Sequence, residues 1–246
     1  MNIYKLNFRI FLNMIFSFLS FPKSCSYCNS VSYKMALCKR CSEKLIMEIK
    51  TKRCKTCGKE LFFEDSLCTK CRNQDEKSSL FGEFESVFPI FTYALQKKRL
   101  IYLWKTKKNR ELGFFFAKIL ARHLNEKLKN IPIVPVPPRP DKIKTKGFDQ
   151  IDDLTTILEK KYKIIVCRLL EKQGKLQQKK LSKQDRLLES QKAFLPKTNL
   201  NIDEIPKEVV LIDDVITTGA TINSCKIALE KLGVKKIHVV SLFAVP

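Results

Sequence analysis

The 246-residue chain has few histidines, few arginines and few acidic residues. Its two histidines, His123 and His238, fit no metal-ligand or catalytic spacing, and we interpret both as structural. Arginine fills ten of the 47 basic positions, and because reading of base edges favours the guanidinium fork, this scarcity argues against sequence-specific DNA recognition. The 25 acidic residues leave a formal net charge of +22, which attracts polyanions such as nucleic acid unless the lysine excess only reflects an AT-rich coding sequence.

Residues 1–24 lack the marks of an exported protein. Their apolar side chains recur at helical spacing, which predicts an amphipathic helix. Asn13 interrupts the apolar run, and no small-x-small cleavage site precedes Pro22. We therefore expect neither a secretory signal peptide nor a stable membrane span, with a helix lying on a membrane surface as the alternative.

Eight of the ten cysteines form four Cys-x-x-Cys pairs in the first third of the chain. Two thiolates on a tight turn present both sulfurs to one ion, and a second such turn completes the tetrahedron that Zn²⁺ prefers. A thioredoxin-like redox site needs one pair, not four within fifty residues. The spacing predicts two structural zinc sites, with pairing across the two halves as an alternative. The ligands would be Cys25, Cys28, Cys38 and Cys41 in the first site, and Cys54, Cys57, Cys68 and Cys71 in the second.

The segment 209–221 combines an apolar strand, two carboxylates and a turn of small residues. Such a strand is buried on both faces of a parallel sheet, and its carboxyl end opens into a ligand cleft. Hydroxyls and backbone N–H groups of the turn can hold a phosphate at a helix N-terminus, while the carboxylates suit sugar hydroxyls. This predicts a site for a phosphorylated ribose, accompanied by Mg²⁺; a capped helix after an ordinary core strand is the alternative. The residues are Asp213, Asp214, Thr217, Thr218, Gly219, Ala220 and Thr221.

A proline-rich turn and a cluster of cations precede this segment. Residues 135–138 contain three prolines, which fix the loop conformation, and Arg139 follows them directly. Lys142, Lys144 and Lys146 come next, and their charges suit a diphosphate. The alternative is a set of solvated loop lysines.

Strands alternate with helices beyond residue 85. This order predicts parallel βαβ units in a doubly wound, mostly parallel α/β sheet. The polar, basic stretch 170–188 reads as a loop over the cleft. We expect strands at 86–93, 131–136, 163–167, 209–212 and 236–245, and helices at 111–128, 151–162 and 220–232. The predicted domains are a helix (1–24), a zinc module with two four-cysteine sites (25–71), a linker (72–85) and the α/β domain (86–246).

The segment 209–221 resembles the signature of type I phosphoribosyltransferases, and together with the cysteine pairs it resembles the ComF family of competence-associated proteins. The resemblance covers nearly the whole chain from Cys25. It implies that the two aspartates hold the ribose hydroxyls of 5-phosphoribosyl 1-diphosphate and that the Thr/Gly loop holds its 5′-phosphate. Arg139 and Lys146 would bind the diphosphate. The other matching elements are Pro135-Val136-Pro137, Gly147-Phe148-Asp149-Gln150, Gln178 to Ser182, Arg186 and Ala193-Phe194.

The same resemblance implies a role in natural transformation. It implies a cytoplasmic protein that handles single-stranded DNA with an ATP-driven translocase, and so associates with the membrane through the competence machinery. Three departures concern catalysis: Lys146 stands where the family has Arg, Asp149 where it has Asn, and Glu189 where a second Asn is usual. An active transferase, with Asp213 and Asp214 as catalytic groups and an unidentified nitrogenous acceptor, and a non-enzymatic adaptor or sensor are both open readings.

Overall fold

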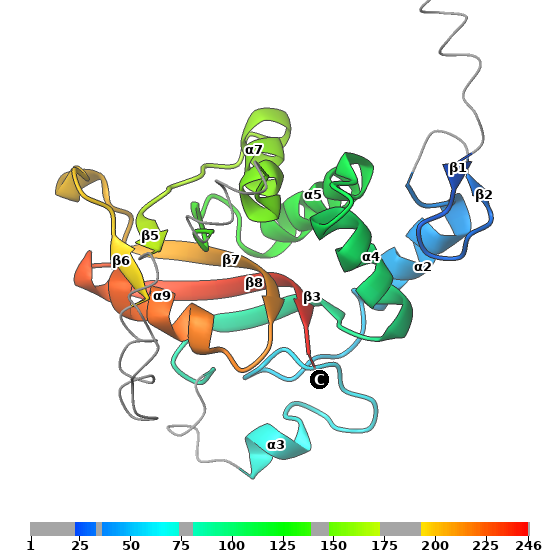
Figure 1. The fold of residues 1–246 in the computed structure, drawn as a ribbon. Coiled ribbons are helices and arrows are strands. Elements are labelled where there is room, and N and C mark those ends of the chain that lie inside the picture. The colour runs from blue at the N-terminus through cyan, green and yellow to red at the C-terminus, as the bar shows by residue number, and fades with distance from the viewer. Residues whose placement is uncertain (1–22, 33–35, 74–80, 139–147, 173–192, 246) are drawn as a thin grey trace, which may run out of the picture.

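The computed structural model describes residues 23–32, 36–73, 81–138, 148–172 and 193–245 (Figure 1). The predicted amphipathic helix therefore lies almost wholly outside the described residues, as do the cations of the proline-rich turn and the segment from Gln178 to Arg186. The last two residues of that predicted helix, Lys23 and Ser24, form strand β1 instead.

The centre of the fold is a four-stranded parallel sheet in the order β3-β8-β7-β4. The prediction of a doubly wound α/β sheet is confirmed. Val166 makes only an isolated parallel bridge to Ile133, so the strand predicted at 163–167 is almost entirely absent. The strands are β3 (Ser86–Thr92), β4 (Ile133–Pro135), β7 (Glu208–Ile216) and β8 (Lys236–Ala244).

Helices cover both faces of this sheet (Figure 1). Alternate residues of β7 divide between two apolar cores: Val210 and Ile212 face one, and Val209 and Leu211 face the other. The first core is completed by α4 (Leu95–Lys105), α5 (Arg110–Lys127) and α7 (Gln150–Tyr162). The second is completed by α9 (Ala220–Lys231) and by the antiparallel hairpin of β5 (Leu170–Lys172) and β6 (Phe194–Pro196), with a short 3-10 helix, η3 (Ile202–Glu204), before β7.

The amino-terminal module consists of two small ribbons. The first contains β1 (Lys23–Ser24), β2 (Val31–Ser32) and α2 (Lys39–Glu48), and the second contains α3 (Thr69–Arg72). Leu45 of α2 belongs to the same apolar core as Phe116 of α5, so the first ribbon is packed into the main body.

The second ribbon covers the outer edge of β3. Gly58 lies so close to this strand that a Cβ atom on it would be 2.2 Å from Pro89 Cδ and 2.5 Å from the carbonyl oxygen of Val87. The Arg53 guanidinium donates hydrogen bonds to the carbonyl oxygens of Ile90 (2.8 Å) and Gly58 (3.1 Å). Because an open sheet edge is a template for unwanted strand pairing, the ribbon protects the sheet.

Every helix in the described ranges is too short or too polar to cross a bilayer.

Candidate sugar-phosphate and metal sites

Asp213 and Asp214 lie within β7 and not after its end. The strand continues to Ile216, because β8 pairs with it as far as the register Ile216 with Ala244. Successive side chains of a strand point to opposite faces, so the two carboxylates are separated. Asp214 contacts α4 and α7, whereas Asp213 faces Cys225 of α9 and Lys172 of β5.

Asp214 is a buried carboxylate held by two side chains. Lys105, the last residue of α4, places its Nζ 2.7 Å from Asp214 Oδ2. Gln150, the first residue of α7, donates from Nε2 to the same oxygen. Both the aspartate (8% exposed) and the glutamine (4% exposed) are shielded from solvent, so this geometry is fixed by packing as well as by charge. Neither partner was predicted, although Gln150 lies in a motif that the sequence singled out.

Asp213 has a different electrostatic environment. Burial and then the negative charge of Asp214 raise its pKa from the ordinary 3.8 to about 7, against the opposing effects of the Asp214 N–H, Lys105 and Lys172. The N–H of Asp214 donates to Asp213 Oδ1 at 2.7 Å. At neutral pH this carboxyl is therefore divided between its protonated and ionised forms.

The turn after β7 offers hydroxyls and a helix N-terminus. Thr217, Thr218 and Thr221 are exposed, and Gly219 precedes α9 with a left-handed φ of +83°. N–H groups in the first turn of a helix lack intrahelical acceptors, so they are available to an anion. The space beside Gly219 is taken by the ring of Phe81, which would lie 3.1 Å from a Cβ atom there. An anion would therefore contact the turn on the side of its threonines and not beside Gly219.

Asp149 has a structural role that the sequence did not reveal. Its Oδ1 accepts hydrogen bonds from the N–H groups of Ile151 (2.9 Å) and Asp152 (3.1 Å), so it caps α7 and places Gln150 beside Asp214. Asp and Asn are comparable helix caps, so Asp149 keeps the local structure that an Asn at this position would give.

Neither of two well-formed cavities in the described part of the chain includes the segment 213–221. One, of about 500 Å³, is bordered by the turn 135–138, Phe148 and Lys172. It adjoins the aspartates, because the N–H of Val136 donates to the carbonyl oxygen of Ile212. The other, of about 560 Å³, lies between α2, α5 and the end of α7, away from both aspartates. The predicted cations Arg139 and Lys146 lie outside the described residues.

The cysteines gather into two clusters of four thiols, each within one ribbon. In each cluster the four Sγ atoms lie within 4.8 Å of one another, and the pairing across the two halves is not what the structure shows. Hydrogen bonds from Ser30 lower the pKa of Cys28 to about 6, whereas burial raises the pKa of Cys41. Four such thiols can all be ionised only beside a cation, and a tetrahedral set of thiolates fits structural Zn²⁺ with no position open for catalysis.

Comparison with known proteins agrees with this arrangement. A double zinc ribbon domain matches residues 17–72, and a phosphoribosyl transferase domain matches residues 142–246. The chain is 33% identical over 153 residues to competence protein ComFC of Streptococcus pneumoniae, covering 62% of this chain and 66% of that protein. It is 29% identical over 178 residues to competence protein F of Haemophilus influenzae, covering 70% and 76%. The chain is similar to these two competence proteins and carries both domains. The first alignment spans just under two thirds of that relative's length.

The two domain matches cover different candidate sites. The double zinc ribbon covers both cysteine clusters, and the phosphoribosyl transferase domain covers the aspartate pair, the turn and Gln150. Lys105 lies outside both matched ranges, and its helix was not predicted. No motif therefore pointed to it, and only the fold brings it to Asp214.

Proposed function

We propose that this protein is a member of the ComF family, binds 5-phosphoribosyl 1-diphosphate with Mg²⁺ and acts in DNA uptake during natural transformation. One observation carries the proposal: residues 213–221 combine two carboxylates, which can accept hydrogen bonds, with an exposed threonine turn at a helix N-terminus. Asp213 and Asp214 would accept hydrogen bonds from the ribose hydroxyls. Hydroxyls and N–H groups of Thr217, Thr218, Gly219, Ala220 and Thr221 would hold the 5′-phosphate, and Arg139 and Lys146 would hold the diphosphate.

The carboxylates fit a Mg²⁺ that arrives with its ligand better than a resident ion. Asp214 is already neutralised by Lys105, and Asp213 is partly protonated at neutral pH. Mg²⁺ keeps several waters and is commonly held by substrate phosphates. When bound, it would neutralise part of the diphosphate charge.

Transferase activity is the catalytic form of this proposal. A nitrogen nucleophile would displace diphosphate at the anomeric carbon, and a nearby base would take the proton that the nucleophile loses. Asp213 suits that task, because a general base works best with a pKa near the operating pH. Asp214 suits it less, since Lys105 and Gln150 already bind its Oδ2. Release of diphosphate with a panel of nitrogenous acceptors would separate an enzyme from a sensor.

Calorimetry with phosphoribosyl diphosphate and Mg²⁺ tests the binding proposal. We expect the wild type to bind and Asp213→Asn and Asp214→Asn each to lose at least about ten-fold in affinity, the loss of roughly one charge-assisted hydrogen bond. Asp203→Asn, which changes an exposed carboxylate in η3, is the matched control and should bind normally. Equal heats from the wild type and the two site variants would remove the site from the proposal.

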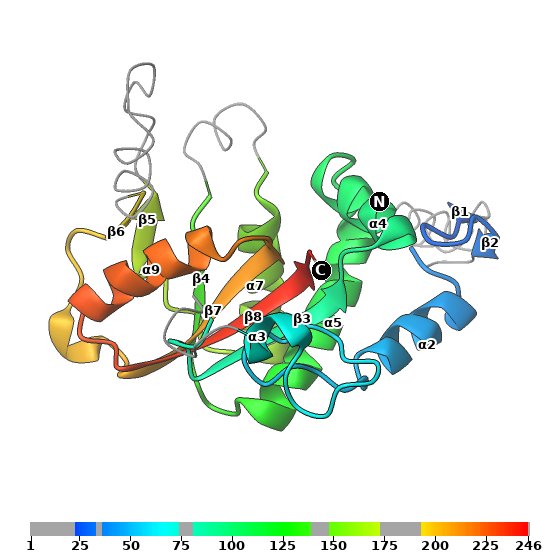
Figure 2. The same ribbon diagram turned by 90° about the horizontal axis from the view of Figure 1, so that it is seen from below.

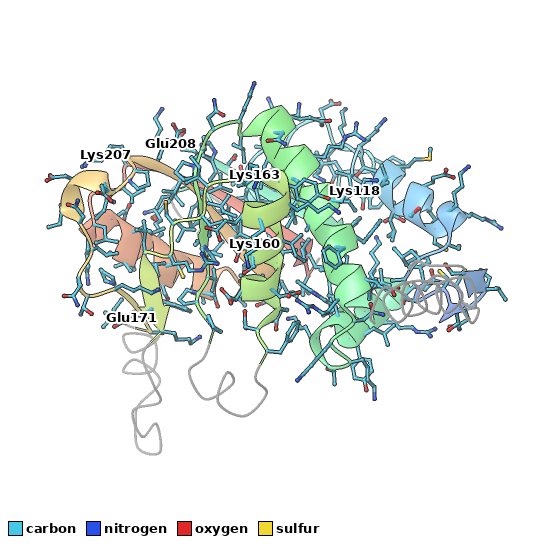
Figure 3. All side chains as sticks on the ribbon, turned by 90° about the horizontal axis from the view of Figure 1, so that it is seen from above. Lys118, Lys160, Lys163, Glu171, Lys207 and Glu208 are labelled. Carbon is cyan, nitrogen blue, oxygen red and sulfur yellow. The ribbon has the colours of Figure 1, made fainter. Side chains whose placement is uncertain are left out.

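Single-stranded DNA is the second ligand that this function requires. The competence-named relatives and the net charge of +22 favour it, and exposed lysines line the face of α5 and α7, among them Lys118, Lys160 and Lys163 (Figure 3). The role places the protein in the cytoplasm beside an ATP-driven translocase that delivers the strand.

Fluorescence anisotropy with an oligothymidylate tests the DNA proposal. Affinity should fall by at least about ten-fold between roughly 50 and 200 mM salt, because each phosphate contact releases a counterion. Replacing Lys118, Lys160 and Lys163 by Ala should weaken binding and flatten this salt dependence. The control carries the same change of charge at Lys207, Lys231 and Lys235. Affinity that does not depend on salt would refute electrostatic contact with DNA.

A further inference from the structure

Helix α4 is tied to the first ribbon at one end and to the aspartate pair at the other. Lys97, in its first turn, places Nζ 2.5 Å from Oε2 of Glu48, the last residue of α2. Lys105, its last residue, makes the 2.7 Å ion pair with Asp214. The side chains of Lys97 and Asp214 are both only 12% exposed. Such partly buried pairs are screened by salt much less than surface pairs.

Between these two contacts α4 is a short, well-packed helix. Leu100 and Trp104 are fully buried, and the Trp104 ring meets the ring of Phe116 edge-on at 5.1 Å. Lys97 and Lys105 are eight residues apart, about 12 Å along the axis. Figures 1 and 2 show α4 between the first ribbon and the sheet. A shift of α4 at its ribbon end would therefore be carried to its site end.

The first cysteine cluster fixes the position of α2. Cys38 is the N-cap of this helix and Cys41 lies in its first turn, so two of the four thiols of the cluster hold its amino end. Leu45 anchors its centre in the main core. The position of Glu48, and with it the ion pair to Lys97, therefore depends on how the first ribbon is placed.

We propose that α4 couples the first zinc ribbon to the ribose site, with Lys105 as a positioning residue for Asp214 and the Glu48–Lys97 pair holding α4 in register. Lys105 and Gln150 both bind Oδ2 of Asp214, so among the described residues Oδ1 stays available to a ligand hydroxyl. Without Lys105 the buried carboxylate loses its cation and its orientation. The ligand end of this inference rests on the proposed function, whereas the coupling through α4 does not. Because such coupling is reciprocal, ligand at the site would also stabilise the first ribbon.

The coupling can be measured without any ligand, because Trp104 is the only tryptophan of the chain and lies on α4. Its single indole N–H resonance reports on the position of the helix. We expect Glu48→Gln, at the ribbon end, and Asp214→Asn, at the site end, each to shift this resonance. Arg99→Met, an exposed change on the same helix, should leave it in place. An unmoved resonance in both Glu48→Gln and Asp214→Asn would overturn the coupling.

Calorimetry with phosphoribosyl diphosphate and Mg²⁺ then tests the consequence at the site. Glu48→Gln and Lys97→Met should each weaken binding about three- to ten-fold, and the double variant should be no weaker than the worse single, since both break one contact. Lys105→Met should weaken binding at least as much, and Lys105→Arg should restore it. Variants of the Glu48–Lys97 pair that melt earlier but bind as tightly as the wild type would show a purely structural role. Absence of binding by the wild type would refute the proposed function, and the indole resonance would then decide the coupling alone.

Discussion

Two neighbouring aspartates of one strand have unequal chemical characters. Asp214 is held by Lys105 and Gln150, whereas Asp213 has a pKa raised to about 7 by burial and by the charge of Asp214. The sequence identified both residues as acceptors for a sugar. It could not distinguish them, because the difference comes from α4 and α7, which reach Asp214 from distant parts of the chain.

Replacing Asp213 by Asn should stabilise the protein at high pH only. The pKa of Asp213 is about 7 in the folded chain and 3.8 ordinarily, so its contribution to stability is fully present below about pH 4 and is lost as pH rises through 7. Asn stays neutral throughout. Melting temperatures of Asp213→Asn and the wild type should therefore coincide near pH 4 and separate by a few degrees in favour of the variant at about pH 8. A difference that does not change with pH would contradict the raised pKa.

Two helices that begin with a side-chain cap were predicted well, and two helices that lack one were missed. Asn109 and Asp149 cap α5 and α7 through their side chains, and both helices appear within one residue of their predicted starts. Helix α4 follows Ala94, which offers no side-chain cap, and helix α2 follows Cys38, whose side chain accepts no capping hydrogen bond. The end of β7 was placed too early because its apolar run stops at Ile212, although pairing with β8 carries the strand to Ile216.

The contact between the second ribbon and β3 should be sensitive to one methyl group. Gly58→Ala would place a Cβ atom against Pro89 and Val87, so the ribbon must move away from the strand. Gly233→Ala is the matched control, because Gly233 also has a positive φ (+85°) but meets only the flexible end of Lys207 at 3.6 Å.

Both substitutions cost about 1–2 kcal/mol for the left-handed backbone. Gly58→Ala should lower the free energy of unfolding further and should also expose the β3 amides to hydrogen exchange, whereas Gly233→Ala should leave them protected. Equal effects of the two variants would show that the close approach of ribbon and strand does not contribute.

At the scale of the whole molecule, the two ribbons are joined to the α/β body in different ways. Cys25, Cys41 and Leu45 of the first ribbon belong to the main apolar core, whereas Cys54, Leu61 and the other buried residues of the second form a small core of their own. The cysteine spacing predicted two zinc sites. It could not predict how each ribbon packs against the α/β body, because the positions of the metal ligands do not determine which surface a ribbon covers.

Loss of zinc from the two ribbons should therefore have different consequences. We expect two zinc ions per chain in a chelator colour assay, and one each in Cys41→Ser and Cys71→Ser. Cys41→Ser should lower the melting temperature more, because it disturbs the main core. Cys71→Ser should leave the core folded but promote self-association seen by light scattering, because it uncovers the edge of β3. Equal melting temperatures and monomeric behaviour for both variants would contradict this division.

The cover on β3 also matters for the order in which the protein is made. The partner of β3 in the sheet is β8, the last strand of the described residues, which begins 144 residues after β3 ends. At typical elongation rates this separation corresponds to roughly 7–30 s of translation. Throughout that interval the nascent strand has no sheet neighbour on one side, while the ribbon that shields the other side has already left the ribosome. Metal binding by the second cluster during synthesis would thus keep the edge of β3 from pairing with nascent chains on adjacent ribosomes before β8 is made.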